Sequence, residues 1–262
     1  NRTLVLAVET KGNNIWRDKL PENAIFLDYS AFTSDLSTDD SLSLLVTFLI
    51  AIAEKNATLH LKSCWVVEQL LNRYAKALST YYFIYSYLFC IPWRRYFNHW
   101  VLAEEMVERV RKHLPYVTAF ISDNKSLPAE MLRLFGEVYK EKFNATIYAY
   151  CNAEAKLTNN LTFVKMKRLL WASRICSQKR VDLLPRIASR LEDLGVQVVI
   201  DIYGQVEEGI RIKETSSLKY KGTFNTLSDV DLSLYSGFIY TSAYDGVPNI
   251  ILETMANGLP VV

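Results

Sequence analysis

Short apolar, β-rich segments alternate with longer segments of helical period along almost the whole chain. Residues 4–8 form a continuous apolar run typical of a buried strand, whereas residues 65–78 place apolar side chains at the spacing of one helix face. Strands and helices that alternate in this way form βαβ units, which build parallel sheets. The pattern therefore predicts an α/β protein with helices packed on parallel sheets.

The alternation occurs twice, which predicts two domains. The first series has expected strands at 4–8, 24–27, 57–61, 81–90, 117–122 and 146–150, and expected helices at 41–54, 65–78, 102–113 and 128–135. The second series has expected strands at 169–173, 196–203, 219–224 and 238–241, and expected helices at 181–194 and 249–256. Residues 151–160 are small and polar and are expected to form a linker. We therefore place the domains at residues 1–155 and 161–262.

Composition narrows the class of protein. Hydrophobic residues make up 50% of the 262 residues, and the net charge of +2 gives no argument for a nucleic-acid partner. The four cysteines and three histidines show no metal-ligand spacing, so no metal is expected and the thiols are interpreted as free in a reducing compartment. The longest apolar stretches are shorter than the roughly 20 residues of a membrane-spanning helix, and no signal peptide is visible. A soluble, cytoplasmic protein is expected.

The loop after the expected strand at 169–173 carries Arg174 and Lys179. In open parallel sheets, ligands bind beyond the carboxyl ends of the strands, and an arginine and a lysine at such a position suit a diphosphate group. The surrounding segment 165–190 is strongly basic and contains a single acidic residue, Asp182. The two cations are therefore either anion ligands or part of a solvated basic surface, and residue types alone leave both interpretations open.

A second loop, 241–248, leads from an expected strand into the helix at 249–256. Gly246 allows a ligand to approach the backbone closely, and the helix N-terminus offers unpaired amide groups to phosphate. Glu253, about one turn into the helix, is placed to accept hydrogen bonds from two vicinal hydroxyl groups. Taken alone, Glu253 and Asp245 would be interpreted as an ordinary helix-surface acid and a turn residue.

Several segments together resemble one enzyme family. In chain order they are Trp171-Ala-Ser-Arg174, Lys179-Arg-Val-Asp-Leu-Leu, Tyr203-Gly204, Tyr220-Lys-Gly222-Thr-Phe and Thr241-Ser-Ala-Tyr-Asp245-Gly-Val-Pro-Asn-Ile-Ile-Leu-Glu253-Thr-Met-Ala-Asn-Gly258. The set resembles the donor-binding half of the retaining GT-B glycosyltransferases of glycosyltransferase family 4. The resemblance covers the second half of the chain in its motifs, and the first half only in the order of strands and helices.

This resemblance implies a GT-B fold, in which two Rossmann-like domains face each other across a cleft. Residues 161–262 would bind a UDP- or GDP-linked sugar donor, and residues 1–155 would bind the acceptor. The family resemblance further implies a hexosyltransferase that retains the anomeric configuration without a metal or another cofactor. In such a reaction the leaving diphosphate helps to deprotonate the acceptor, so fixed cations around the diphosphate are the main contribution of the protein.

Carried over residue by residue, the resemblance assigns roles to both loops. Arg174 and Lys179 would hold the diphosphate and stabilise its charge as it leaves, and Glu253 would bind the ribose. Asp245 occupies the position of a glutamate that usually contacts the donor sugar, and with the two cations it completes the expected catalytic set. The remaining expected donor-binding residues are Gly204, Gly246, Val247, Pro248 and Asn249.

The expected acceptor domain is less well defined by its motifs. His60 ends an expected strand where family members often carry a histidine near the cleft, and the competing interpretation is a partly buried structural histidine. The aromatic run at 81–89 is interpreted as a core strand. The acceptor implied by the resemblance is a glycan or a lipid-linked glycan, in surface polysaccharide or glycolipid synthesis. By the family pattern, a first strand with a glycine-rich loop and the end of the donor domain are expected outside residues 1–262.

Alternatives to this enzyme remain open. A catalytically inactive GT-B homologue that acts as a binding or partner subunit is one, because Asp245 departs from the usual glutamate. A dinucleotide-dependent oxidoreductase is disfavoured because no G-x-G-x-x-G motif follows an expected strand. The basic segment 165–190 also suggests a peripheral contact with an anionic membrane.

Overall fold

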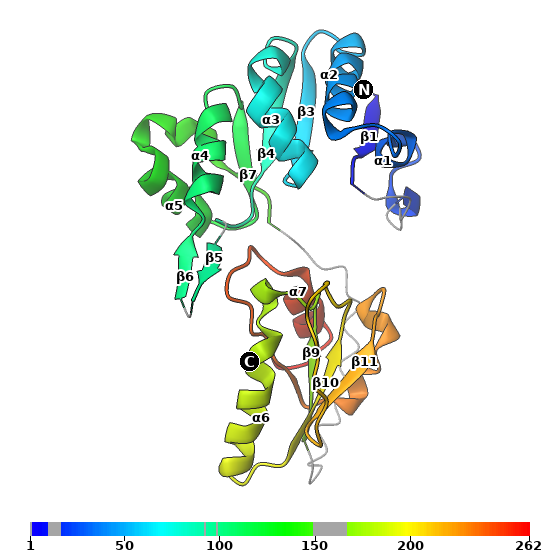
Figure 1. Cartoon of the computed structure of the whole chain (residues 1–262), viewed down its shortest axis with the longest axis vertical. Helices are drawn as coiled ribbons and strands as arrows, with labels where there is room; N and C mark the ends of the chain where they lie inside the picture. Colours follow the sequence, from blue (N-terminus) through cyan, green and yellow to red (C-terminus); the bar gives the residue numbers. More distant parts are fainter. Residues whose placement is uncertain (1, 10–16, 92, 98, 149–166) are drawn as a thin grey trace. The chain divides into compact units, whose positions relative to one another are not determined.

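The computed structural model describes residues 2–9, 17–91, 93–97, 99–148 and 167–262, which divide into two α/β units (Figure 1). The first unit comprises Asn1–Leu88 and Ala103–Thr146, and the second comprises Phe89–Leu102 and Ile147–Val262. The expected linker at 151–160 lies outside the described residues. Within the described part of the chain, no helix is both long and apolar enough to cross a bilayer.

The first unit is built on a four-stranded sheet of order β3-β4-β7-β8, in which all neighbouring strands are parallel. Its strands are β3 (Ala57–Lys62), β4 (Tyr82–Tyr87), β7 (Ala119–Ser122) and β8 (Ala145–Thr146). A separate parallel pair is formed by β1 (Thr3–Ala7) and β2 (Ala24–Asp28). The helices are α1 (Tyr29–Phe32), α2 (Thr38–Ala51), α3 (Trp65–Leu78), α4 (Glu104–His113) and α5 (Ser126–Phe135), with 3₁₀ turns η1 (Arg17–Lys19) and η2 (Glu137–Phe143). The parallel α/β architecture is the one predicted.

Side-chain caps explain why two helices begin earlier than expected. The Ser37 hydroxyl accepts a hydrogen bond from the Asp40 amide, so α2 begins at Thr38. The Asn124 carboxamide oxygen accepts the amides of Ser126 and Leu127 at 3.1 and 2.9 Å, and α5 begins there. The spacing of apolar residues predicted both helices. It did not predict their first turns, because these depend on polar capping residues.

The aromatic strand β4 divides its side chains between two faces of the sheet. Tyr82 and Ile84 are buried, as a core strand requires, but Phe83 lies on the other face and is 50% exposed. Parallel register places Tyr85 beside His60 of β3 on that open face. The interpretation as a core strand therefore holds for one face only, and the second face carries partly exposed aromatic rings.

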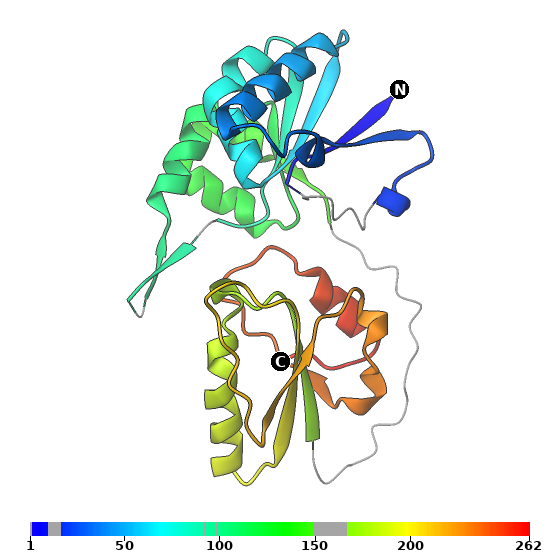
Figure 2. The ribbon, with the colours of Figure 1, turned by 45° about the vertical axis from the view of Figure 1, so that its right-hand side comes forward.

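The second unit has a parallel sheet of order β11-β10-β9-β12, with a helical layer on each face (Figure 2). Its strands are β9 (Lys167–Ala172), β10 (Val198–Tyr203), β11 (Leu218–Gly222) and β12 (Gly237–Phe238). Its helices are α6 (Leu184–Asp193) and α7 (Asn249–Ala256), with 3₁₀ turns η3 (Ser177–Lys179), η4 (Val181–Leu183), η5 (Leu227–Asp229) and η6 (Leu232–Leu234). Leu170 and Trp171 are both buried and belong to separate core clusters on opposite faces. This two-sided burial explains the continuous apolar run of β9.

An antiparallel hairpin also belongs to the second unit. Its strands, β5 (Trp93–Tyr96) and β6 (His99–Leu102), lie in a segment for which the sequence pattern predicted only the start of a helix at residue 102. The indole ring of Trp100 meets the ring of Tyr244 edge to face, with centroids 5.5 Å apart. The turn at Phe97 lacks the glycine that usually marks a tight hairpin, which is why the sequence pattern did not reveal it.

Candidate functional site

Two loops of the second unit leave the same edge of its sheet. The loop that carries Arg174 and Lys179 follows β9, and the loop that carries Asp245 follows β12. Because β9 and β12 are parallel neighbours, their carboxyl ends lie side by side. The chain thus brings two of the segments predicted to bind a ligand to one edge of the sheet.

Hydrogen bonds join the two loops to each other. The Thr241 hydroxyl donates to the Lys179 carbonyl at 2.7 Å, and the Ala243 amide donates to the Gln178 carbonyl at 2.8 Å. The side-chain amide of Gln178 donates to the Tyr244 carbonyl at 2.8 Å. These contacts link residues far apart in sequence and fix the backbones from which Lys179 and Asp245 project.

Lys179 and Asp245 form an ion pair at this junction. The Lys179 ammonium contacts Oδ2 of Asp245, and the two side chains are only 12% and 23% exposed. The Tyr240 hydroxyl donates to the same carboxylate oxygen, and the Lys179 nitrogen lies 5.7 Å from the centre of the Tyr240 ring. Burial, together with the hydrogen bond to Asp245, raises the pKa of Tyr240, so this phenol stays protonated. The structure therefore brings together Lys179 and Asp245, two of the three predicted catalytic residues, beside the protonated hydroxyl group of Tyr240.

Arg174 has a different environment. Its side chain is 61% exposed, and its Nε lies 3.5 Å from Oε1 of Glu207, which is itself partly exposed. An exposed pair of this kind contributes little to stability. Among the described residues, the ion pair of Arg174 is with Glu207 and not with Asp245, so the two predicted diphosphate ligands have separate acidic partners.

Gly204, which follows β10, is required by backbone packing. It has a φ of +144°, and a Cβ placed on it would lie 1.7 Å from the Ser173 carbonyl oxygen. Its amide donates to the Gly222 carbonyl and its carbonyl accepts from the Tyr220 hydroxyl, both at 2.9 Å. The family resemblance implies that Gly204 binds the donor, and the structure adds a steric reason for a glycine at this position.

The loop through Gly246, Val247 and Pro248 leads into α7. The N-terminus of α7 has no side-chain cap, which leaves its first amides available to an anion. Glu253 is partly buried, and in the part of the chain that is described its carboxylate forms no hydrogen bond or ion pair. A carboxylate with unused acceptor capacity, close behind an uncapped helix N-terminus, suits a ligand that carries both phosphate and hydroxyl groups.

The predicted acceptor-side residue, His60, lies in the first unit on the open face of the sheet. Its ring stacks on Tyr85 with centroids 5.0 Å apart and an interplanar angle of 17°. Its Nδ1 lies 3.2 Å from the Tyr87 hydroxyl oxygen. His60 is exposed, so the alternative of a partly buried structural histidine does not describe it.

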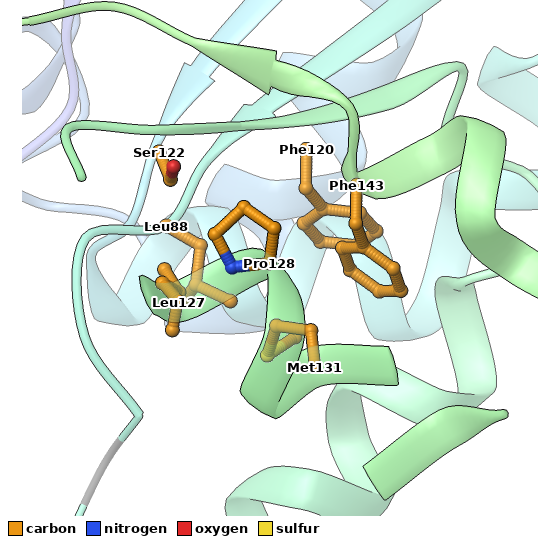
Figure 3. A pocket seen from close by; sticks show the side chains of 7 residues that line it. All are labelled: Leu88, Phe120, Ser122, Leu127, Pro128, Met131 and Phe143. Atoms are coloured by element: carbon orange, nitrogen blue, oxygen red, sulfur yellow. The ribbon is translucent and has the colours of Figure 1, made fainter. Parts of the chain in front are cut away.

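The first unit also has a pocket that sequence reasoning missed (Figure 3). It is a small space, and its lining residues are Leu88, Phe120, Ser122, Leu127, Pro128, Met131 and Phe143. The pocket lies where β7 ends and α5 begins, which is the ligand-binding edge of a parallel sheet. The apolar periodicity of these residues indicated a core, and only the three-dimensional arrangement shows that they leave a space. In the described residues, no group of His, Cys, Asp and Glu side chains could hold a metal ion.

The sequence matches no protein-family model and no curated protein. Its two α/β units with parallel sheets define the GT-B class of fold, and solved GT-B glycosyltransferases are similar to it. One is TarM, with a TM-score of 0.63 and 16% identity over 84% of this chain and 44% of TarM. A second is the pneumococcal O-GlcNAc transferase GtfA, with a TM-score of 0.53, 13% identity and the same two coverages. A third is the trehalose 6-phosphate synthase of Burkholderia multivorans, with a TM-score of 0.57 and 9% identity over 91% of this chain and 62% of that one.

These similarities confirm the predicted fold class. The chain spans less than half the length of TarM and of GtfA. At such low identities the similarity concerns the fold, and the activity has to be argued from the residues themselves.

Proposed function

We propose that the chain is part of a glycosyltransferase that moves a sugar from a nucleotide-sugar donor to a glycan or lipid-linked acceptor. The observation that carries this proposal is the junction of Lys179, Asp245 and Tyr240 in front of the uncapped N-terminus of α7. A cation, an acid and free helix amides at the carboxyl edge of a parallel sheet suit a nucleoside diphosphate joined to a sugar.

The proposed chemistry depends on stabilising a leaving group. Lys179 and Arg174 would neutralise the charge that develops on the diphosphate, and the α7 amides would add hydrogen bonds. Glu253 would accept hydrogen bonds from the ribose hydroxyls. In this proposal the donor diphosphate competes with Asp245 for Lys179, and Asp245 then turns towards the donor sugar. The reaction would retain the anomeric configuration without a metal, as family 4 enzymes do.

The solved structures guide the choice of ligand. A TarM mutant was solved in complex with UDP, and GtfA was solved in complex with UDP and GlcNAc. These complexes support UDP as the first nucleotide to test, and the product we propose is a surface polysaccharide or glycolipid. A cytoplasmic location, with the acceptor presented at the membrane or on a protein partner, is part of the same proposal.

A second candidate is a catalytically inactive partner subunit. The ion pair between Lys179 and Asp245 favours it, because the cation that should stabilise the leaving group already has an acidic partner. The structure of a GtfA/B complex, with a TM-score of 0.51 to this chain, shows a related fold in a two-protein assembly. Binding of a nucleoside diphosphate without turnover across a panel of donors would favour this candidate.

Calorimetric titration with UDP and GDP tests the donor site. Lys179→Ala should weaken diphosphate binding by about tenfold or more, because it removes a charge-assisted hydrogen bond to the ligand. The exposed Lys213→Ala, in the same unit, is the matched control and should bind as the wild type does. Equal affinity in wild type and Lys179→Ala would exclude the proposed site. Donor hydrolysis or transfer that disappears in Glu253→Ala, in a protein that stays folded, would then distinguish the enzyme from the inactive subunit.

A further inference from the structure

A long connection joins β4 to α4. β4 ends at Tyr87 and α4 begins at Glu104, and the segment Phe89–Leu102 between them, which contains the hairpin of β5 and β6, belongs to the second unit. Connections between a strand and the next helix usually have about two to six residues. A connection this much longer than usual often carries function. The hairpin is therefore a candidate for a role at the site of the second unit.

The two faces of the hairpin differ in exposure. Tyr96 lies opposite His99 in the register of the strands, and successive side chains alternate between faces, so Trp100 and Leu102 lie on the other face. Trp100 is partly buried, whereas Tyr96 is 60% exposed. The face that carries Trp100 is therefore the one that packs against the second unit.

Trp100 contacts the loop that follows β12. Its indole ring meets the ring of Tyr244 edge to face, with centroids 5.5 Å apart and an interplanar angle of 72°. The Tyr244 carbonyl oxygen accepts a hydrogen bond from the side-chain amide of Gln178 at 2.8 Å. Tyr244 is thus held at two points, by its ring on the hairpin and by its carbonyl group on the loop after β9.

Asp245 directly follows Tyr244, so the position of the Tyr244 backbone limits where the Asp245 carboxylate can lie. That carboxylate contacts the Lys179 ammonium group and accepts a hydrogen bond from the Tyr240 hydroxyl. We propose that Trp100 is a positioning residue, which holds Asp245 against Lys179 through the ring of Tyr244. Edge-to-face aromatic pairs have a preferred geometry, so the contact fixes an orientation as well as adding burial.

This positioning has a consequence for the proposed donor site. There the donor diphosphate competes with Asp245 for Lys179, so a residue that holds the pair closed lowers the affinity for the diphosphate. The hairpin continues at both ends into the first unit, which ties the donor loop to the unit expected to bind the acceptor. The consequence rests on the proposed function, whereas the positioning of Asp245 does not.

Chemical labelling of Lys179 tests the positioning without a ligand. A brief reaction of the full chain with N-hydroxysuccinimide acetate acetylates accessible lysines, and mass spectrometry compares the labelled fraction at Lys179 with that at the exposed Lys213. In the wild type Lys179 should react slowly, because its ammonium group is paired and its side chain is 12% exposed. Trp100→Ala should raise the ratio by about threefold or more, because the contact that holds the pair closed is lost. Trp100→Phe keeps a ring at this position and should stay close to the wild type.

Two controls separate positioning from a general loss of structure. Tyr96→Ala removes a ring from the other face of the hairpin and should leave the ratio unchanged. In an Asp245→Asn background the charge pair is already lost, so Trp100→Ala should add nothing. An unchanged ratio in Trp100→Ala, an equal rise in Tyr96→Ala or a further rise in the Asp245→Asn background would overturn the proposal. Where circular dichroism shows that Trp100→Ala is unfolded, Tyr244→Leu removes the same contact from the loop and decides by the same rise.

UDP affinity, measured by calorimetry, is the second readout. Trp100→Ala should bind UDP about threefold more tightly than the wild type, because Lys179 is released from Asp245. A chain that binds no UDP but shows the expected labelling would contradict the proposed function and leave the positioning of Asp245 in place. UDP binding with unchanged labelling of Lys179 would do the reverse.

Discussion

The two units bury polar groups in different ways. The second unit buries charges in pairs, with the 1% exposed Asp201 bound by Arg168 at 2.7 Å and Lys179 bound by Asp245. In the first unit His113 is only 4% exposed, and in the described part of the chain its Nδ1 has no hydrogen-bond partner. Opposite charges compensate each other for the loss of water on burial, whereas a buried histidine without a charged partner has to stay neutral. This difference between paired charges and an unpaired histidine predicts how each unit responds to substitutions and to a change of pH.

The largest effect is expected from Gly204→Ala, which changes the second unit only. The new methyl group would overlap the Ser173 carbonyl oxygen, and alanine would have to adopt a φ of +144°. Backbone cannot move aside as a flexible side chain can, so we expect a loss of about 3 kcal/mol or more in the free energy of unfolding. Chemical denaturation followed by circular dichroism measures it. Gly209→Ala, at a positive φ with no neighbouring atom near, is the control and should cost less.

Acid should destabilise the first unit through His113. Burial lowers the pKa of His113 to about 4, whereas the pKa of a histidine in the unfolded chain is about 6.5. Between these values the unfolded chain binds a proton that the folded chain does not. The free energy of unfolding should therefore fall as the pH decreases from about 6.5 to about 4, by up to roughly 3 kcal/mol.

Unfolding of wild type and His113→Gln across this pH range tests the assignment. The glutamine variant should lose that part of the pH dependence which belongs to His113. An unchanged slope would show that the acid sensitivity arises elsewhere, and the contrast between the two units would then have to be abandoned.

Asp245→Asn should lower the stability of the protein moderately and raise its affinity for UDP. The variant leaves a mostly buried Lys179 without its acidic partner, which should cost about 1–2 kcal/mol of stability. It also frees Lys179 for the diphosphate, so UDP affinity should rise about fivefold. Asp245→Glu, which keeps the charge, should show no such rise. Tighter UDP binding in Asp245→Asn would support competition between carboxylate and diphosphate, and weaker binding would contradict it.

Sequence patterns predicted the architecture well because burial imposes periodicity. The continuous apolar run of β9 arises from burial on both faces, and the 65–78 helix has the bounds that its period indicated. Polar caps such as Ser37 shifted helix starts, and the hairpin was missed because Phe97 occupies a turn position where glycine is usual. The two site loops were located because both follow strands of a parallel sheet. What sequence could not supply was the pairing of charges, since the ion pair of Lys179 with Asp245 joins residues far apart in the chain.

The smallest effect on stability should come from Arg174→Ala, which makes it the sharpest test of the difference between the two cations. The Arg174 pair with Glu207 is exposed on both sides, so its loss should change the free energy of unfolding by less than about 0.5 kcal/mol. If Arg174 nevertheless binds the diphosphate, UDP affinity should fall by about tenfold in a protein of unchanged stability. Calorimetry and thermal denaturation on the same sample separate the two effects. Unchanged UDP affinity would assign Arg174 to the solvated surface and leave Lys179 as the cation of the site. A fall in UDP affinity at unchanged stability would show that Arg174 contributes to binding and not to the fold.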